Sequence, residues 1–395
     1  MDTPASVLVV GASAAGLSTA QALRRNGYQG GITVLGAESE LPYDRPPLSK
    51  QILAGTWEPE RAQLRPAAHL SDLNIDFILG DPAVALDAES RTVHAESGLA
   101  VQADAIVIAT GVRPRTLFGA TASAGVHVLR TLEEALALRA DLLTATRLVV
   151  VGEGVLGSEI AATARKLGLD VTIVGPLSAP MAGQLGPRVA SLLGDLHTEN
   201  GVNLRLGTGV SELVRNAGRV AGVRLDTGEE LPADLVVVAV GATPATEWLD
   251  GSGLTLDNGV VCDANCRAAE GIYAVGDVAR WHHDHVGALV RLENRTNATE
   301  QAAAVAANIL GAEQPYTPIS YFWTDQFDAK IQVHGTLPAG AEVEIVEGST
   351  DERRFVARYR ADGRVTGVVG WNMPKQTRLR RQDVVDAQSV TVPAH

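Results

Sequence analysis

Hydrophobic residues near the N-terminus change their period within a short distance. Residues 7–10 form an unbroken apolar run, which is typical of a parallel strand buried on both faces. Two glycines frame a turn at residues 11–16, and apolar residues then recur at helical spacing over residues 17–23. Gly27 is a suitable stop for this helix, and a second strand follows at residues 31–38. The pattern predicts a strand–turn–helix–strand unit.

The same succession returns over residues 147–175, with Gly168 as the helix stop. Residues 103–115 and 233–244 share another pattern, in which a short apolar strand leads into a glycine. Residues 271–279 then resume a strand after the second unit. We therefore expect two related units, the second inserted into the first.

The pattern changes once more in the last part of the chain. Residues 318–395 alternate short strands with tight turns, which indicates an antiparallel sheet. The predicted fold class is α/β, with two Rossmann-like dinucleotide-binding domains and an α+β C-terminal domain containing an antiparallel sheet. The expected boundaries are 1–114 with 242–317 for the first domain, 115–241 for the inserted domain and 318–395 for the last.

Composition narrows the class of protein. The 395 residues are 46% hydrophobic and carry a formal net charge of −13, which argues against binding to nucleic acid or to an anionic membrane. The N-terminus has no basic segment followed by an apolar stretch and a cleavage site, and no apolar run approaches a membrane span, so a cytoplasmic protein is expected. The two cysteines, Cys262 and Cys266, are either ordinary thiols or a regulatory disulfide.

The second glycine turn carries a complete GxGxxG motif. Its first glycine permits a tight turn, its second lets the backbone approach a pyrophosphate, and its third lets helix and strand pack closely. The helix N-terminus then offers unpaired N–H groups to the phosphates. A strand and a helix flank the motif, so it predicts a dinucleotide site at Gly152, Gly154, Val155, Leu156 and Gly157.

The first glycine turn is similar but incomplete, because Ser13 stands at the middle glycine. The serine hydroxyl could itself bond a phosphate. Glu38 ends the next strand, where a carboxylate can hold an adenosine ribose or simply be solvated. Asp277 ends another apolar strand, as a ligand-binding group or as a helix cap. The motif predicts phosphate contacts at Gly11, Ser13, Ala14, Ala15 and Gly16.

Taken together, these motifs resemble a known family. The most specific segment is LPYDRPPLSK at residues 41–50; it is joined by ATGVRPR, VLRTLEEA, GSEIAATA, AVGDVA and YFWTDQFD, in that order. The whole chain resembles the FAD-dependent NAD(P)H:ferredoxin reductases of bacterial cytochrome P450 and Rieske oxygenase systems, flavoproteins with the glutathione-reductase fold. The resemblance implies that the first domain binds FAD, that the inserted domain binds NADH or NADPH, and that electrons pass singly to a 2Fe–2S ferredoxin.

The resemblance also implies roles for individual residues. Lys50 would lie beside the reactive edge of the flavin and pair with Glu159, and these two residues would tune the reduced flavin. The alternative for Lys50 is a surface lysine at the start of a short helix, and for Trp323 an aromatic residue between domains. Further FAD contacts would come from Arg45, Val84, Ala109, Thr110, Gly111, Arg113, Arg130, Gly276, Asp277, Arg295 and Trp323. Further NAD(P)H contacts would come from Glu159, Gly175 and Gly241.

The chain departs from the family at two of these positions. The strand after the second glycine motif ends in Gly175, where relatives carry the acid that bonds the ribose of NADH. No arginine replaces that acid to hold a 2′-phosphate, so the choice between NADH and NADPH stays open. Arg295 stands where many relatives carry tryptophan, as a flavin contact or as a surface arginine.

Electrons must leave the flavin directly, because the chain has no cysteine before Cys262 and disulfide reductases of this fold need one near the first glycine motif. A basic patch is needed to dock an acidic ferredoxin on an acidic chain. The candidate is Lys375, Arg378, Arg380 and Arg381, unless this charge run is only a solvated face. Two other functions stay open: a reductase of monodehydroascorbate or a quinone, and a non-catalytic flavoprotein similar to apoptosis-inducing factor.

Overall fold

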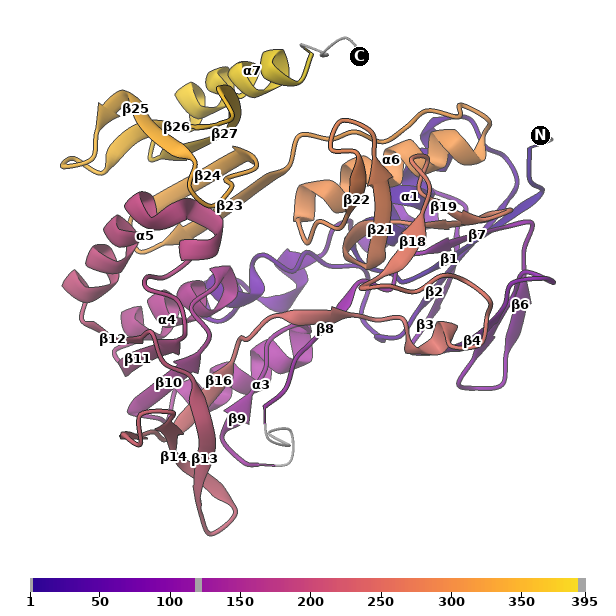
Figure 1. Ribbon diagram of the computed structural model, residues 1–395. Helices are drawn as coiled ribbons and strands as arrows, with labels where there is room; N and C mark the ends of the chain where they lie inside the picture. The colour runs from indigo at the N-terminus through magenta and orange to yellow at the C-terminus, as the bar shows by residue number, and fades with distance from the viewer. Residues whose placement is uncertain (1–2, 118–122, 390–395) are drawn as a thin grey trace. The chain divides into compact units, whose positions relative to one another are not determined.

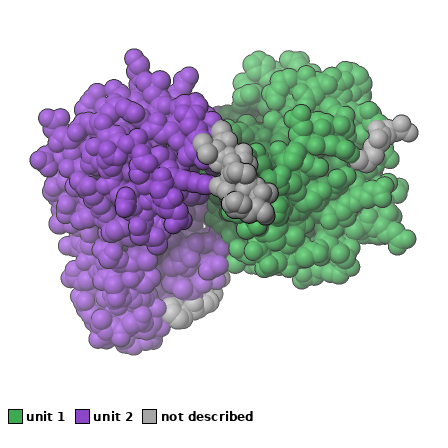
Figure 2. Space-filling model, turned by 45° about the horizontal axis from the view of Figure 1, so that its top comes forward, with its two compact units in different colours: residues 1–44, 62–113, 243–320 green, residues 45–61, 114–242, 321–395 purple. Residues whose placement is uncertain are grey.

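The computed structural model describes residues 3–117 and 123–389. The chain divides into two compact units, coloured separately in Figure 2. Unit 1 comprises residues 3–44, 62–113 and 243–320, and unit 2 comprises residues 45–61, 114–117, 123–242 and 321–389. The loop at residues 45–61 therefore groups with the second unit rather than with the strands that precede it. The three-domain boundaries expected from the sequence stay a prediction.

Unit 1 is built on a sheet in which five strands run parallel and one edge strand runs antiparallel (Figure 1). In spatial order the strands are β19 (Arg267–Ala269), β20 (Ile272–Ala274), β7 (Ala105–Ile108), β1 (Ser6–Val10), β2 (Gly31–Gly36) and β3 (Asp76–Leu79). The central strands are unbroken apolar runs because both faces of the sheet are covered. The main helices are α1 (Ala14–Arg25), which ends before Gly27 as predicted, and α6 (Arg295–Ile309).

Smaller elements complete unit 1. Two three-stranded sheets comprise β4 (Ala83–Asp87), β5 (Thr92–Ala95) and β6 (Ala100–Gln102), and β18 (Val260–Cys262), β21 (Ala279–His283) and β22 (Ala288–Val290). The short helices are α2 (Ala67–Ser71), η4 (Glu247–Leu249) and η5 (Gly276–Val278). The short strands β8 (Val112–Pro114) and β17 (Ala242–Pro244) lie where the chain passes between the units.

Unit 2 contains the second parallel sheet. Its order is β12 (Val202–Leu206), β11 (Asp170–Gly175), β10 (Arg147–Val151), β16 (Leu235–Val238) and β9 (Val126–His127). The helices are α3 (Leu132–Leu142), α4 (Val155–Lys166) and α5 (Ala182–Glu199), and the loop contributes η1 (Leu48–Ile52) and η2 (Pro59–Ala62). A small antiparallel sheet comprises β13 (Val210–Asn216), β14 (Arg219–Leu225) and β15 (Glu230–Pro232).

The C-terminal part of unit 2 is an antiparallel sheet followed by a helix, as the change of pattern predicts. The sheet order is β23 (Tyr321–Gln326), β24 (Ala329–Gly335), β27 (Arg364–Trp371), β26 (Arg354–Ala361) and β25 (Glu342–Ser349), and the helix is α7 (Pro374–Ser389). The fold-class prediction is confirmed: two parallel α/β sheets and one antiparallel domain. Within the described residues, no helix combines the length and apolar character needed to cross a membrane.

Candidate functional site

The first glycine turn of unit 1 has a backbone that tolerates no side chain. Gly11 has φ of +119°, and a Cβ there would meet the backbone carbonyl of Ala109. A Cβ on Gly16 would collide with the carbonyl oxygen of Gly11. Ser13 is the N-cap of α1, yet its side chain makes no capping hydrogen bond. The Ser13 side chain thus leaves the N-terminal N–H groups of α1 available to a phosphate.

The same turn lies against the segment that contains Gly276 and Asp277. Gly276 has φ of +74°, and a Cβ on it would lie 3.0 Å from the Cβ of Ala15. The Gly276 N–H donates to Oε1 of Gln301 at 2.8 Å, which fixes η5 against α6. Asp277 follows on η5, and its backbone carbonyl accepts from Arg291. Sequence motifs more than 250 residues apart therefore meet at one edge of the sheet.

A carboxylate lies beyond the end of β2, as the sequence predicts. Glu38 is half-buried, and its Oε2 accepts a hydrogen bond from the Tyr43 hydroxyl. A glycine cradle, an uncapped helix N-terminus and a strand-end acid are the features that hold the pyrophosphate and ribose of a dinucleotide. The residues of unit 1 therefore fit the adenosine and diphosphate half of FAD.

The other predicted FAD residues of unit 1 differ in how deeply they are buried. Ala109 is buried, Gly111 has φ of +69°, and the Thr110 hydroxyl donates to the carbonyl of Ala245 at 2.8 Å. Arg113 and Val84 are exposed: Arg113 pairs with Glu247, and Val84 is 49% exposed on β4.

Arg295 is neither a solvated surface arginine nor unpaired. It opens α6 with a side chain that is 24% exposed and pairs with the carboxylate of Asp44. It also donates to the hydroxyl of Thr299 one turn along the helix. Asp44 belongs to the segment LPYDRPPLSK, so the arginine holds the start of that segment to α6.

Unit 2 brings Lys50 and Glu159 together. Lys50 Nζ lies 2.7 Å from Glu159 Oε2, and the side chains are only 13% and 6% exposed. The same oxygen accepts from the Ser49 hydroxyl at 2.5 Å, while Oε1 accepts from the Thr324 hydroxyl at 2.8 Å. Helix α4 presents the glutamate, and η1 presents the serine and the lysine. A buried ion pair with this many partners has a fixed geometry.

Further residues, which were not predicted from the sequence, extend this pair into a network. Gln326 donates to the Thr324 hydroxyl at 3.0 Å and accepts from Nε2 of the buried His197 at 2.7 Å. Burial lowers the pKa of His197, with the bond to Gln326 opposing the shift. The Thr163 hydroxyl donates to the carbonyl of Ser49 at 2.7 Å, which ties η1 to α4. Alternation along YFWTDQFD, which puts Thr324 and Gln326 on one face of β23, is the signal that could have found two of these residues.

Two further predicted FAD residues of unit 2, Arg45 and Trp323, contact neighbouring groups of the same unit. The Arg45 guanidinium donates to the backbone carbonyl of Arg130, whose N–H donates to Glu134 in the capping box of α3. Trp323 is half-buried on β23, and its ring stacks on that of Tyr321 with centroids 6.0 Å apart.

The second glycine turn has the same kind of close backbone contacts as the first. Gly152 has φ of +115°, and a Cβ on it would meet the carbonyl of Ala239, while a Cβ on Gly157 would collide with the carbonyl of Gly152. Gly154 is the N-cap of α4 and has no side chain to cap it. Gly241 has φ of +92° in the loop after β16. These residues, with Val155 and Leu156 in the first turn of α4, fit a second dinucleotide.

The two cysteines are poor redox groups. Both are buried free thiols in unit 1. Burial raises the pKa of Cys266 to about 12, with a bond from Gln301 opposing the shift, and burial also raises the pKa of Cys262. Neither thiol is thus a thiolate near neutral pH.

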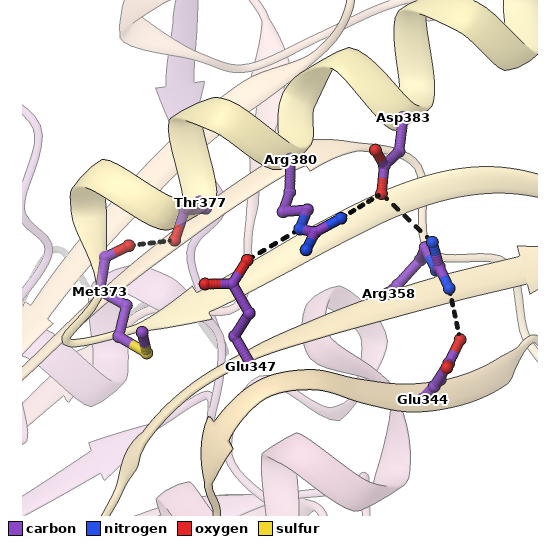
Figure 3. Close-up of polar contacts among 7 residues, drawn as sticks. All are labelled: Glu344, Glu347, Arg358, Met373, Thr377, Arg380 and Asp383. Atoms are coloured by element: carbon purple, nitrogen blue, oxygen red, sulfur yellow. Dashed lines mark hydrogen bonds and ion pairs between the residues drawn. The ribbon is translucent and has the colours of Figure 1, made fainter.

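The basic residues of α7 divide into two groups. Arg380 is tied into an ion-pair network, in which its Nε lies 2.8 Å from Glu347 and its Nη1 lies 3.9 Å from Asp383, which also pairs with Arg358 (Figure 3). Lys375, Arg378 and Arg381 are exposed. The structure therefore separates Arg380, which holds α7 to the sheet, from three exposed cations.

Two family models match the chain. Pyridine nucleotide-disulphide oxidoreductase matches residues 5–302, and reductase C-terminal matches residues 321–394. The chain is 38% identical to rhodocoxin reductase of Rhodococcus erythropolis, over 98% of this chain and 91% of that protein. It is 38% identical to the ferredoxin–NAD(+) reductase subunit of the benzene 1,2-dioxygenase system of Pseudomonas putida, over 98% and 94%.

Solved structures agree with these matches. The reductase in the covalent putidaredoxin reductase–putidaredoxin complex superposes with a TM-score of 0.92 at 34% identity, over 98% of this chain and 94% of that chain. The family prediction made from the sequence is confirmed. The chain belongs to the pyridine nucleotide-disulphide oxidoreductase family and, within it, to the ferredoxin reductases of oxygenase systems.

Proposed function

We propose that this protein takes hydride from NAD(P)H onto FAD and passes electrons singly to a 2Fe–2S ferredoxin that serves a cytochrome P450 or a Rieske oxygenase. The observation that carries the proposal is the coexistence of two glycine cradles with the buried Lys50–Glu159 pair. Bound FAD supplies the step from two-electron to one-electron chemistry. The relatives named above carry out this kind of transfer, according to their names, in dioxygenase and putidaredoxin systems.

Lys50 and Glu159 are the residues that we assign to tuning. Glu159 is held by the Ser49 and Thr324 hydroxyls on both carboxylate oxygens, so it fixes the position of the lysine ammonium. A fixed cation in a site that excludes water stabilises nearby negative charge more strongly than a solvated cation does. The pair would therefore favour the reduced, electron-rich state of the cofactor.

The surroundings of the cysteines support direct exit of electrons from the cofactor. Both thiols are buried with raised pKa, and the segment before Cys262 supplies none. Thiol–disulfide exchange requires an accessible thiolate. An iron–sulfur protein that accepts single electrons is the acceptor class that this arrangement suits.

We place ferredoxin docking on the exposed part of α7. Lys375, Arg378 and Arg381 are exposed, and Leu379 between them is 66% exposed. Cations around an exposed apolar residue suit an acidic partner, since charge steers the encounter and apolar contact stabilises it. Arg380 is left out of the patch because Glu347 and Asp383 already pair with it.

The function is tested by anaerobic rapid mixing of the flavin-loaded protein. Flavin absorbance should bleach with NADH or NADPH and recover when oxidised 2Fe–2S ferredoxin is added. Bleaching without recovery by ferredoxin, together with fast turnover on a quinone or on monodehydroascorbate, would favour a small-acceptor reductase. A long-lived complex with NADH that no acceptor discharges would favour a non-catalytic flavoprotein.

The docking patch needs a separate test with a matched control. The variant Arg378→Glu/Arg381→Glu should raise the KM for ferredoxin about 10-fold or more at low salt, with bleaching by the nucleotide unchanged. Arg364→Glu reverses an exposed arginine on β27 and should leave that KM unchanged. Equal effects of the two changes would place docking elsewhere.

A further inference from the structure

The strand-end position that lacks an acid is not an empty space. Gly175 is buried at the end of β11, and a Cβ built on it would collide with the carboxylate of Glu153. Glu153 comes from the second glycine motif, where it is the residue between the first two glycines. A carboxylate therefore does lie at the end of β11, but a different part of the chain supplies it. An acidic side chain at position 175 would have to displace the Glu153 carboxylate from this place.

The Glu153 side chain is buried and held in place. It is 4% exposed, and its Oε1 accepts from the Leu177 N–H at 2.8 Å, just beyond the end of β11. The backbone carbonyl of Glu153 also accepts from the Met181 N–H at 2.8 Å and from the Ser158 hydroxyl at 3.2 Å. These bonds connect the turn after β10 to the loop after β11.

One carboxylate oxygen of Glu153 is left over. Among residues 3–117 and 123–389, Oε2 accepts no hydrogen bond and the carboxylate forms no ion pair, and Oε2 is not one of the side-chain atoms buried without a partner. This oxygen is therefore accessible to a ligand, and a hydrogen-bond donor there would stabilise it. The hydroxyl groups of a bound adenosine ribose are donors of the right kind, and the end of the second strand is where that ribose lies in a dinucleotide fold.

The segment after β11 provides no cation for a 2′-phosphate, since residues 176–187 contain no lysine or arginine. Arg205, on the neighbouring strand β12, is already paired with Glu229. A 2′-phosphate there would be repelled by the Glu153 carboxylate. The ribose of NADH would meet only an acceptor for its hydroxyls.

We propose that Glu153 replaces the missing strand-end acid, binds the adenosine ribose hydroxyls through Oε2 and makes the protein selective for NADH over NADPH. The proposal rests on the proposed function, because it assumes that the second glycine turn binds a nicotinamide nucleotide. The loss of the acid at Gly175 is then an exchange between two chain positions rather than a loss of ribose recognition.

The first experiment compares two isosteric variants of the flavin-loaded protein. Binding of NAD⁺ and NADP⁺ is measured by calorimetry, and flavin bleaching is measured with NADH and NADPH. Glu153→Gln keeps the acceptor for Leu177 but removes the charge, so the NADH:NADPH preference should fall about 10- to 100-fold in both readouts. Glu212→Gln alters a surface carboxylate that pairs with Arg224 on β14 and should leave the preference unchanged.

A second experiment moves the acid back to the strand. Glu153→Gly/Gly175→Asp removes the collision and should restore NADH selectivity, whereas Gly175→Asp alone should weaken both nucleotides because the two carboxylates clash. An unchanged preference in Glu153→Gln, or a wild-type protein that binds both nucleotides equally, would overturn the assignment but leave the reductase standing. A wild-type protein that binds neither nucleotide would instead overturn the proposed function.

Discussion

The two glycine turns of this protein share one backbone and carry different chemistry. Gly11 and Gly152 have φ of +119° and +115°. A Cβ added to Gly11 would meet the carbonyl of Ala109, which follows β7, and a Cβ added to Gly152 would meet that of Ala239, which follows β16. The side chains differ. The acid that we expect to serve the first turn is Glu38, beyond β2, whereas the second turn has Glu153 within the turn itself. Backbone geometry fixes where phosphates bind, and separate positions supply the groups that distinguish one ligand from another.

The helices that follow the turns differ in the same way. Two residues after the last glycine, α1 carries Ser18 and α4 carries Glu159. Glu159 is buried in the network with Lys50 and Thr324. We therefore expect the second unit to combine nucleotide recognition with the polar pair that we assign to tuning, and the first unit to bind FAD phosphates at its own glycine turn.

The largest effects are expected from glycine substitutions that disrupt one of the two turns. Gly11→Ala should abolish retention of FAD and destabilise unit 1 by about 3 kcal/mol or more, because the Cβ meets backbone that cannot move aside and φ is unfavourable for alanine. Gly152→Ala should leave the flavin spectrum intact and abolish bleaching by NADH. Flavin content and nucleotide binding of the purified variants measure both effects. Loss of flavin from Gly152→Ala would contradict the division of tasks.

The next effect separates tuning from binding in the second unit. Lys50→Ala leaves the Glu159 carboxylate buried without its cation and should destabilise the protein by about 2–4 kcal/mol. The loss is limited because the Ser49 and Thr324 hydroxyls still donate to the carboxylate. Lys50→Ala/Glu159→Gln should recover part of that loss and still show a lowered flavin midpoint potential. Chemical denaturation and redox titration are the two measurements. An unchanged potential in both variants would remove the pair from the mechanism.

A smaller effect tests the acid of the first unit. Glu38→Gln should weaken FAD affinity about 10-fold, because a carboxylate that accepts from a ribose hydroxyl is a stronger acceptor than an amide. The affinity for NAD⁺ should not change. Fluorescence titration of the apoprotein with FAD, beside the same titration of Glu153→Gln, compares the two acids directly. Equal FAD affinity in the wild type and in Glu38→Gln would show that Glu38 is a solvated acid that does not bind FAD.

The smallest effect concerns acid stability of the second unit. Burial lowers the pKa of His334, which stacks on Tyr321, from 6.5 to about 4, with Arg381 adding to the shift. The neutral form is favoured in the folded state, so stability contributed by this group is complete above pH 6.5 and is lost as pH falls toward 4. His334→Phe should reduce that loss by on the order of 1 kcal/mol. Hydrogen exchange in β23 and β24 at pH 7 and pH 5 measures it, and equal slopes in both proteins would exclude His334.

Much of the fold follows from short-range patterns. Apolar runs at residues 7–10 and 148–151 and the glycines after them predict both parallel sheets, because buried strands and tight turns have local signatures. The pairing of Lys50 with Glu159 came from the resemblance, since nothing local connects positions 109 residues apart. Thr324, Gln326 and His197 were missed because a hydrogen-bond network depends on three elements meeting in space.

The nucleotide preference could not be predicted from the identity of residue 175 alone. The sequence correctly shows that the strand-end acid is absent, and that observation alone left the nucleotide preference open. The structure adds that Glu153 fills the same place, which no spacing rule connects to residue 175. The grouping of residues 45–61 with unit 2 was likewise not predicted, because η1 contacts α4, a helix that comes much later in the sequence.

A crystal structure of the flavin-loaded protein with NAD⁺ would test the roles of the two turns most directly. We expect the pyrophosphate at the N-terminus of α4 and the adenosine ribose hydroxyls within hydrogen-bond distance of Glu153 Oε2. We also expect the FAD phosphates at the N-terminus of α1. A ribose directed away from Glu153 would contradict the exchange of acids, and NAD⁺ bound away from residues 152–157 would contradict the assignment of tasks to the two turns.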